Sequence, residues 1–236
     1  AGAGANGLSI TGGDSTIRGL AINRFEENGI RLSTAGNNTI QGNYIGTDVT
    51  GTLDRGNMKE GVLIVSGSGG NTIGGTIAGA GNVISGNDDD GIDIKDTAGT
   101  GNVIQGNIIG TNAAGTIALG NGDEGIDIRT GSHTIGGASA AARNIISGNL
   151  DAAILISGNG ASGMIVQGNY IGTDVTGTVD LGNGSDGIRF SSSADNITIG
   201  GGIAGAGNII SGNDGHGISI LSGSDITIQG NTIGSG

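Results

Sequence analysis

The chain has 236 residues, a formal net charge of −12, and no cysteine, tryptophan or proline. The negative charge disfavours nucleic acid and anionic membranes, which bind through basic patches, and the lack of cysteine excludes disulfides and thiolate metal sites. No apolar run is long enough to span a membrane, so we expect no membrane insertion.

The predicted elements are short β-strands, and the first kind has the pattern Ile-x-Ile after a glycine or alanine. It recurs along the whole chain, at 7–10, 29–32, 61–64, 91–94, 125–128, 153–156, 187–190 and 217–220. These segments alternate apolar and variable positions, and they are bounded by Gly, Asn, Asp or Ser. β-branched residues dominate them, which favours strands, and no stretch keeps a helical period.

Two further kinds of strand follow in each repeat. Segments resembling NTIQGNYIGT lie at 38–47, 102–111, 164–173 and 226–234, and segments resembling NVISGN lie at 82–87, 144–149 and 208–213. The chain therefore repeats about every 62 residues, and each repeat holds two coils of three strands. Strands this short bury a face only by stacking coil on coil, with parallel pairing. We predict an all-β fold: one parallel β-helix domain over 1–236, with three short sheets and seven to eight coils.

Gly-Asn pairs close many of the strands. Both residues accept positive φ, so the chain can bend sharply there. Stacked asparagine side chains would also hydrogen-bond to one another along the axis, which satisfies the polar groups of the corners. The residues expected in this corner ladder are Asn43, Asn87, Asn107, Asn149, Asn169, Asn213 and Asn231.

The motifs NTIQGN, YIGTD, DGIxI and NVISGN together resemble the right-handed parallel β-helix repeats of very large secreted bacterial surface proteins. The resemblance covers essentially the whole chain. It implies a right-handed coil, an extracellular or cell-surface location in a bacterium, and a place within a longer repeat array. Activity stays open, because this fold serves adhesins, lyases, hydrolases and epimerases alike.

Acidic residues recur just before the Ile-x-Ile strands, and the densest group is DDDGIDI at 88–94. Coil stacking should turn them into a column of carboxylates along one edge. Hard oxygen ligands of this kind suit calcium, although the spacing of an EF-hand is absent. Calcium is therefore the one cofactor that the sequence suggests, and its candidate ligands are Asp88, Asp89, Asp90, Asp123 and Glu124.

Asp93 and Asp127 are the middle residues of two GIDI strands, so they should point to the outer face while the isoleucines point inward. On adjacent coils their separation of about 5 Å would suit a retaining glycosidase. Lys95 and Arg129 lie two positions further on and point the same way. They could neutralise charge beside the base of a lyase or epimerase. An ordinary cross-coil ion pair between Lys95 and Asp127 is the competing interpretation.

The segments around Asp90 and His216 look locally like the acid and Gly-His-Gly segments of polygalacturonase-type hydrolases. In that family the two segments lie on neighbouring coils. Here stacking separates the two residues by four coils, or roughly 19 Å. This departure counts against a hydrolase of that type.

Two functions of different classes fit the sequence. The first is a non-catalytic structural or adhesive module that binds polysaccharide or cell-surface glycan, with Asp90, Glu124, Tyr44 and Tyr170 as candidate contacts. Near-uniform repetition favours it, because an active site normally breaks a repeat with unique residues. The alternative is a polysaccharide-active enzyme, either a lyase, an epimerase or a glycoside hydrolase. Its site would lie on the outer face, with Asp93, Lys95, Asp127 and Arg129 as catalytic residues.

Neither end of the chain carries an amphipathic cap. An uncapped terminal coil exposes unpaired backbone groups and apolar side chains, so we expect fraying or end-to-end association. Light scattering should then report an average mass that rises with protein concentration. A chain that stays strictly monomeric at high concentration would contradict this expectation.

Overall fold

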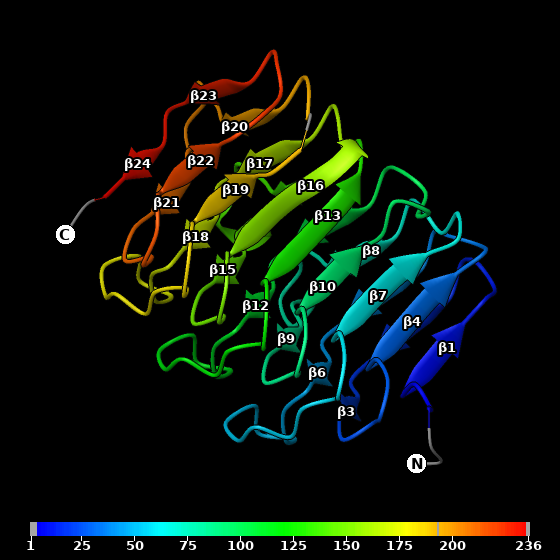
Figure 1. Ribbon diagram of the computed structural model, residues 1–236. Coiled ribbons are helices and arrows are strands. Elements are labelled where there is room, and N and C mark those ends of the chain that lie inside the picture. The colour runs from blue at the N-terminus through cyan, green and yellow to red at the C-terminus, as the bar shows by residue number, and fades with distance from the viewer. Residues whose placement is uncertain (1–3, 193, 235–236) are drawn as a thin grey trace.

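A computed structural model describes residues 4–192 and 194–234. Twenty-four short strands in these ranges wind into eight coils, and every third strand joins the same sheet (Figure 1). The described residues include a single turn of 3₁₀ helix, Ala140–Ala142. No helix in the described part of the chain is both long and apolar enough to cross a membrane.

The three sheets are named A, B and C in chain order, and each has eight strands. Sheet A consists of β1 (Leu8–Ile10), β4 (Ile30–Ser33), β7 (Val62–Val65), β10 (Ile92–Ile94), β13 (Ile126–Thr130), β16 (Ile154–Gly160), β19 (Ile188–Phe190) and β22 (Ile218–Ile220). Sheet B consists of β2 (Thr16–Arg18), β5 (Thr39–Gln41), β8 (Thr72–Gly74), β11 (Val103–Gln105), β14 (Thr134–Gly136), β17 (Ile165–Gln167), β20 (Thr198–Gly200) and β23 (Thr227–Gln229). Sheet C consists of β3 (Ala21–Ile22), β6 (Tyr44–Ile45), β9 (Val83–Ile84), β12 (Ile108–Ile109), β15 (Ile145–Ile146), β18 (Tyr170–Ile171), β21 (Ile209–Ile210) and β24 (Thr232–Ile233).

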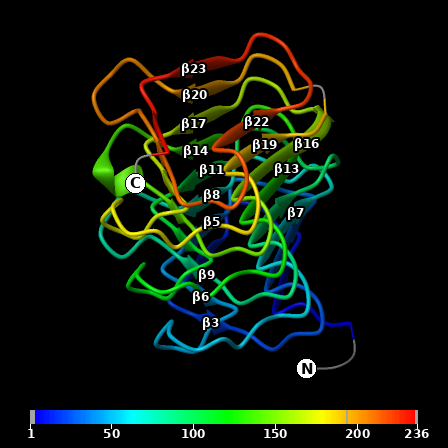
Figure 2. The ribbon, with the colours of Figure 1, turned by 60° about the vertical axis from the view of Figure 1, so that its left-hand side comes forward.

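All strands within the three sheets pair in parallel, so each residue stacks on its equivalent one coil away. Ile92, for example, pairs with Val62 on one side and with Ile126 on the other. These three side chains are fully buried and form part of a continuous aliphatic interior. Figure 2 shows sheet B beside sheet A around this interior. The predicted right-handed parallel β-helix, with three sheets and eight coils, is confirmed.

Asparagine ladders line two of the three corners along most of the rod. At the corner between sheets B and C the rungs are Asn43, Asn82, Asn107, Asn144, Asn169, Asn208 and Asn231. At the corner between sheets C and A they are Asn57, Asn87, Asn121, Asn149, Asn183 and Asn213. The seven asparagines grouped from the sequence are thus divided between two corners. The Gly-Asn steps that end strands follow strands of two different sheets. Other rungs, such as Asn82 and Asn208, also follow a glycine but precede strands of sheet C.

The third corner, between sheets A and B, changes character along the rod. Asn38, Asn71 and Asn102 form a short ladder there, and the Nδ1 atom of His133 accepts a hydrogen bond from the Asn102 backbone amide at 3.2 Å. Burial lowers the pKa of His133 to about 4, so this side chain is neutral near pH 7. One coil further on, the equivalent position is the buried Met164. His133 is therefore the last polar rung at this corner.

Replacing one interior rung should destabilise the rod. The Oδ1 atom of Asn107 accepts from both the backbone and side-chain nitrogens of Asn82, and its Nδ2 donates to Asn144 and Ile73. Asn107→Ala leaves these buried groups unpaired, and we expect the free energy of unfolding to fall by about 2 to 3 kcal/mol. Chemical denaturation followed by circular dichroism measures this. Asn231→Ala, at the last rung, is the control and should change the stability by less than about 1 kcal/mol. Equal effects would contradict the ladder's role.

Candidate functional site on the outer face of sheet A

Seven acidic residues from three adjacent coils gather at the start of the middle strands of sheet A. They form three overlapping groups, and within each group one carboxylate oxygen of every member lies within 4.8 Å of the others. The groups are Asp89, Asp90 and Asp123; Asp90, Asp93 and Asp127; and Asp123, Glu124 and Asp151. These seven residues are called the acid cluster below.

The centre of the acid cluster is a pair of aspartates on neighbouring strands. β10 and β13 pair in register, which sets Asp93 directly beside Asp127. The isoleucines on either side of each aspartate are buried in the interior, so the aspartates point to the outer face of the sheet. The strands beyond carry Leu63 and Leu155 at the same position. The acid pair therefore interrupts a row that is otherwise free of acids.

Both aspartates lie on the outer face, as predicted, but their side chains are covered. Their exposed fractions are 0% for Asp93 and 1% for Asp127. Lys95 contacts the Oδ2 atom of Asp93 and lies 3.5 Å from Oε1 of Glu60. The expected cross-coil pair of Lys95 with Asp127 is therefore wrong, because the ammonium turns toward the preceding coil.

Asp127 is held from two sides. Arg129 Nε donates to Asp127 Oδ2 at 2.8 Å, and Ser157 Oγ donates to its Oδ1 at 3.1 Å. Beyond Asp127, Arg189 reaches back across the coils to Glu124 and Asp151, at 3.1 and 3.0 Å. Three cations thus border the acid cluster.

Burial makes several of these carboxyls weak acids. It is the main cause that raises the pKa of Asp90 to about 9, and the charge of Asp93 adds to it. Burial, followed by the charge of Asp123, raises the pKa of Glu124 to about 7. Burial also raises the pKa of Asp93 to about 6, although the contact with Lys95 opposes the rise. Part of the acid cluster therefore holds protons near neutral pH.

The structure brings together only some of the residues selected from the sequence. Asp88 is exposed and belongs to none of the three groups, whereas Asp89, Asp90, Asp123 and Glu124 do. Glu60, Asp151 and Arg189 were not selected as site residues. Asp151 could have been found, because it precedes an Ile-x-Ile strand as the other acids do.

The two tyrosines lie elsewhere, so the expected sugar contacts are divided between two sheets. Tyr44 and Tyr170 belong to β6 and β18 of sheet C, whereas Asp90 and Glu124 precede strands of sheet A. Tyr170 also has a partner of its own, since the Arg143 guanidinium lies 3.9 Å from the centre of its ring. Both tyrosines come directly after the corner between sheets B and C, so they lie on sheet C and not beside the acids of sheet A.

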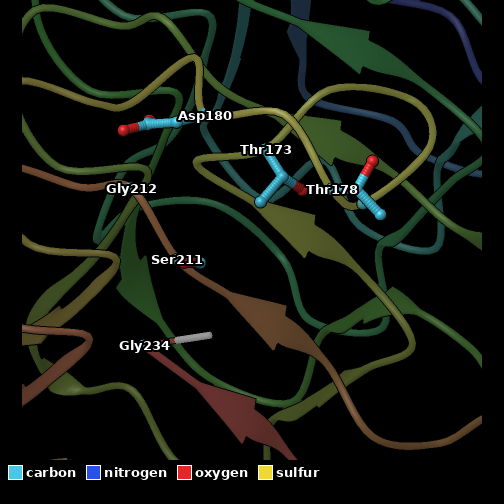
Figure 3. Close-up of a pocket in the computed structure, with 7 residues that line it drawn as sticks. Thr173, Thr178, Asp180, Ser211, Gly212 and Gly234 are labelled. Carbon is cyan, nitrogen blue, oxygen red and sulfur yellow. The ribbon is translucent and has the colours of Figure 1, made fainter. Parts of the chain in front are cut away.

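Two pockets adjoin the loops that lead from sheet C to sheet A. One, of about 340 Å³, is lined by Thr173, Gly177, Thr178, Asp180, Ser211, Gly212 and Gly234. Figure 3 shows the Asp180 side chain at its rim, pointing away from Thr173 and Thr178. The other, of about 230 Å³, lies between Ala118 and the segment 181–184. Neither pocket is lined by Asp93 or Asp127.

Comparison with known proteins gives a likeness of fold. None of the protein-family models matches the sequence, and no curated protein matches it. A solved structure of a double mutant of the periplasmic alginate epimerase AlgG superposes with a TM-score of 0.67 at 16% identity, over 96% of this chain and 47% of that chain. Structures of a single mutant and of the epimerase without substitutions give TM-scores of 0.56 and 0.53, at 16% and 15% identity. They cover 91% and 90% of this chain, and 50% and 51% of theirs.

The chain therefore spans about half the length of the epimerase structures that it resembles. At this identity the likeness shows a shared parallel β-helix. It assigns no catalytic residue to this chain.

The acid cluster should make stability depend on pH. Unfolded carboxyls ionise near pH 4, whereas Asp93, Glu124 and Asp90 ionise near 6, 7 and 9 when folded. The folded state then binds more protons than the unfolded state in this range, so the free energy of unfolding must fall as the pH rises. We expect Asp90→Asn to reduce this fall and to stabilise the protein by about 1 to 3 kcal/mol above neutral pH.

Urea unfolding in EDTA, at several values between about pH 5 and 9, measures this dependence. Asp48→Asn is the control, because hydrogen bonds, chiefly from Thr50, lower the pKa of this exposed carboxyl to about 2. It should leave the slope in this range unchanged. Equal slopes for wild type and Asp90→Asn would show that Asp90 does not hold a proton.

Proposed function

We propose that this chain binds polysaccharide along the outer face of sheet A and acts on it at the acid cluster. The observation that carries the proposal is the register pair of Asp93 and Asp127, each in contact with a cation two residues further along the chain. A base, an acid and groups that neutralise charge are then present at one place. We also propose an extracellular, cell-surface or periplasmic location in a bacterium.

The cations favour an acidic sugar as substrate. Removing a proton from the carbon beside a uronate carboxylate builds negative charge on that carboxylate, and a lysine or arginine beside it stabilises the charge. Lys95 and Arg129 are suited to this role. Asp93, with a pKa of about 6, can exchange a proton near neutral pH, which general acid–base catalysis requires. The reaction class is proton transfer, as in epimerisation or β-elimination.

Substrate must first uncover the two aspartates. The side chains of Lys95 and Arg129 are 28% and 38% exposed, and both heads sit on long flexible stems. A uronate carboxylate on the outer face would compete with Asp93 and Asp127 for these two cations. Their movement toward the sugar would open the acid pair at the moment of binding.

The likeness to an alginate epimerase supports this substrate class, since that protein by its name acts on a polyuronate and shares the fold. A retaining glycoside hydrolase remains compatible with two close carboxyls. The three bordering cations nevertheless favour a charged sugar over a neutral one.

A second candidate is a non-catalytic structural or adhesive module, taken from the repeat array of a large secreted bacterial surface protein. Two observations favour it. The corner ladders and aliphatic stacks repeat with little interruption, and Asp93 and Asp127 are covered by their own cations. Under this proposal sheet A would present a rigid acidic surface that binds glycan without changing it.

A screen against polyuronates and neutral polysaccharides tests both candidates. Proton NMR detects epimerisation, and the absorbance of the unsaturated product detects elimination. We expect turnover of a polyuronate, and a loss of kcat of about 100-fold or more in Asp127→Asn, because a proton-transfer group is removed. The exposed residue Asp225 provides the control, and Asp225→Asn should keep full activity.

Saturable binding without turnover of any polymer would support the adhesive module and exclude the enzyme. Turnover that survives Asp127→Asn would show that the reaction takes place elsewhere on the rod. If no polysaccharide binds, both candidates fail.

A further inference from the structure

We propose that Asp90, Asp93 and Asp127 form a binding site for a divalent cation, and that its chemistry suits calcium. This site lies deeper than the one suggested by the sequence, which used the exposed Asp88 and the acids of the neighbouring loops. It does not depend on the proposed function, because the same cation could hold the coils together in a module without activity.

The distances between the three carboxylates match one shared ion. One oxygen of each lies within 4.8 Å of those of the other two. Calcium binds oxygen at 2.3–2.6 Å, so two ligands of the same ion are at most about 5 Å apart. The three residues also lie on a rigid part of the fold, since Asp93 and Asp127 belong to paired strands and Asp90 directly precedes the first of them.

Asp93, one of the three proposed ligands, has a buried oxygen without a partner in the part of the chain that the structure describes. The Asp93 side chain is fully buried, and its Oδ1 atom has no hydrogen-bond partner among the described residues. The asparagine side chains at the adjoining corner, by contrast, are paired rung by rung. An isolated buried carboxylate oxygen is costly, and a cation bound to it would remove this cost.

The charges around the group leave room for an added cation. Lys95 contacts Asp93 and Arg129 contacts Asp127. Among the ion pairs of the described ranges, none includes Asp90, whose Oδ1 accepts a hydrogen bond from the Glu124 backbone amide at 3.0 Å. Asp90 is thus the one member of the three without an ion pair in these ranges, and a bound ion would supply it with a positive partner.

Lys95 has a second acceptor within reach. Its ammonium lies 3.5 Å from Oε1 of Glu60, and the buried Oε2 of Glu60 lacks a hydrogen-bond partner among the residues described. An ion bound between the three aspartates would displace the ammonium from Asp93, and the lysine could then pair fully with Glu60. Lys95 is therefore a competitor of the ion, and removing its charge should strengthen binding.

The ligand set favours calcium over other divalent ions. Carboxylates are hard ligands, and no histidine or cysteine belongs to the three groups of the acid cluster. Magnesium demands near-ideal octahedral geometry at 2.0–2.1 Å and gives up water reluctantly, whereas calcium accepts irregular sets of six to eight oxygens. Water can complete such a set from the solvent side.

Isothermal titration of the EDTA-treated protein with calcium chloride, near neutral pH, tests the proposal. We expect one saturable site with a Kd of about 10⁻³ M or tighter, and a higher melting temperature when calcium is present. Asp93→Asn should weaken binding about tenfold or more. Lys95→Gln should tighten it about threefold or more, since a nearby positive charge is removed.

Lys59→Gln is the matched control for Lys95→Gln. It removes the same charge from the segment before β7 of sheet A, where Lys59 pairs with Glu27 at 2.8 Å, and Glu27 is outside the acid cluster. Its affinity for calcium should stay within about twofold of wild type. Circular dichroism checks that each variant is folded, and Lys95→Gln keeps the test decisive if Asp93→Asn does not fold.

Three results would overturn the site: no saturable binding to the wild type, equal affinities for Lys95→Gln and Lys59→Gln, or unchanged binding in a folded Asp93→Asn. The readout is binding and not turnover. Failure here would therefore leave the proposed function standing, and a protein without activity could still hold the ion.

Discussion

Stacking of equivalent residues, one coil upon the next about 4.8 Å apart, is the constraint on which the rest of the structure depends. Stacking stabilises isoleucine residues, because identical side chains pack into a column without gaps. Stacking stabilises asparagine residues as well, since each side-chain amide both donates and accepts hydrogen bonds. Asn82, for example, donates a hydrogen bond to Asn107. Stacking does not stabilise aspartate, because a carboxylate only accepts hydrogen bonds and repels the equivalent carboxylate one coil away. A β-helix therefore tolerates an acid pair such as Asp93 and Asp127 only with help from outside the stack.

That help comes from three sources in the middle of sheet A. Lys95 and Arg129 turn back onto their own strands, Arg189 reaches across the coils, and burial keeps protons on part of the group. This arrangement makes the fold less stable than a pair of leucines at the same positions would, such as Leu63 and Leu155 in the flanking strands. Residues that violate the local rules of a fold are the ones most often kept for function. The proposed enzyme, the glycan-binding module and the cation site all depend on this acid pair.

The sequence predicted the fold well because the repeat itself carries the information. Once the Ile-x-Ile strands are aligned, the sheets, the coil number and the register of Asp93 with Asp127 follow. It could not predict which way a long side chain turns, so the partner of Lys95 was wrong. Nor could it predict burial, because covering the acid pair depends on those same side-chain directions. Tyr44 and Tyr170 face outward from sheet C, so an outward direction shared with the acids of sheet A does not bring them together.

His133 gives the rod an internal landmark. The two other corners repeat the same asparagine along most of their length, so a whole coil pair could be duplicated or deleted there without breaking a ladder. At the corner between sheets A and B, the polar rungs end at His133 and an apolar column begins with Met164. Recombination between repeats that crossed this boundary would set an amide against a methionine. At this corner, an exchange of coils on either side of His133 would keep like residues stacked, whereas an exchange across it would not.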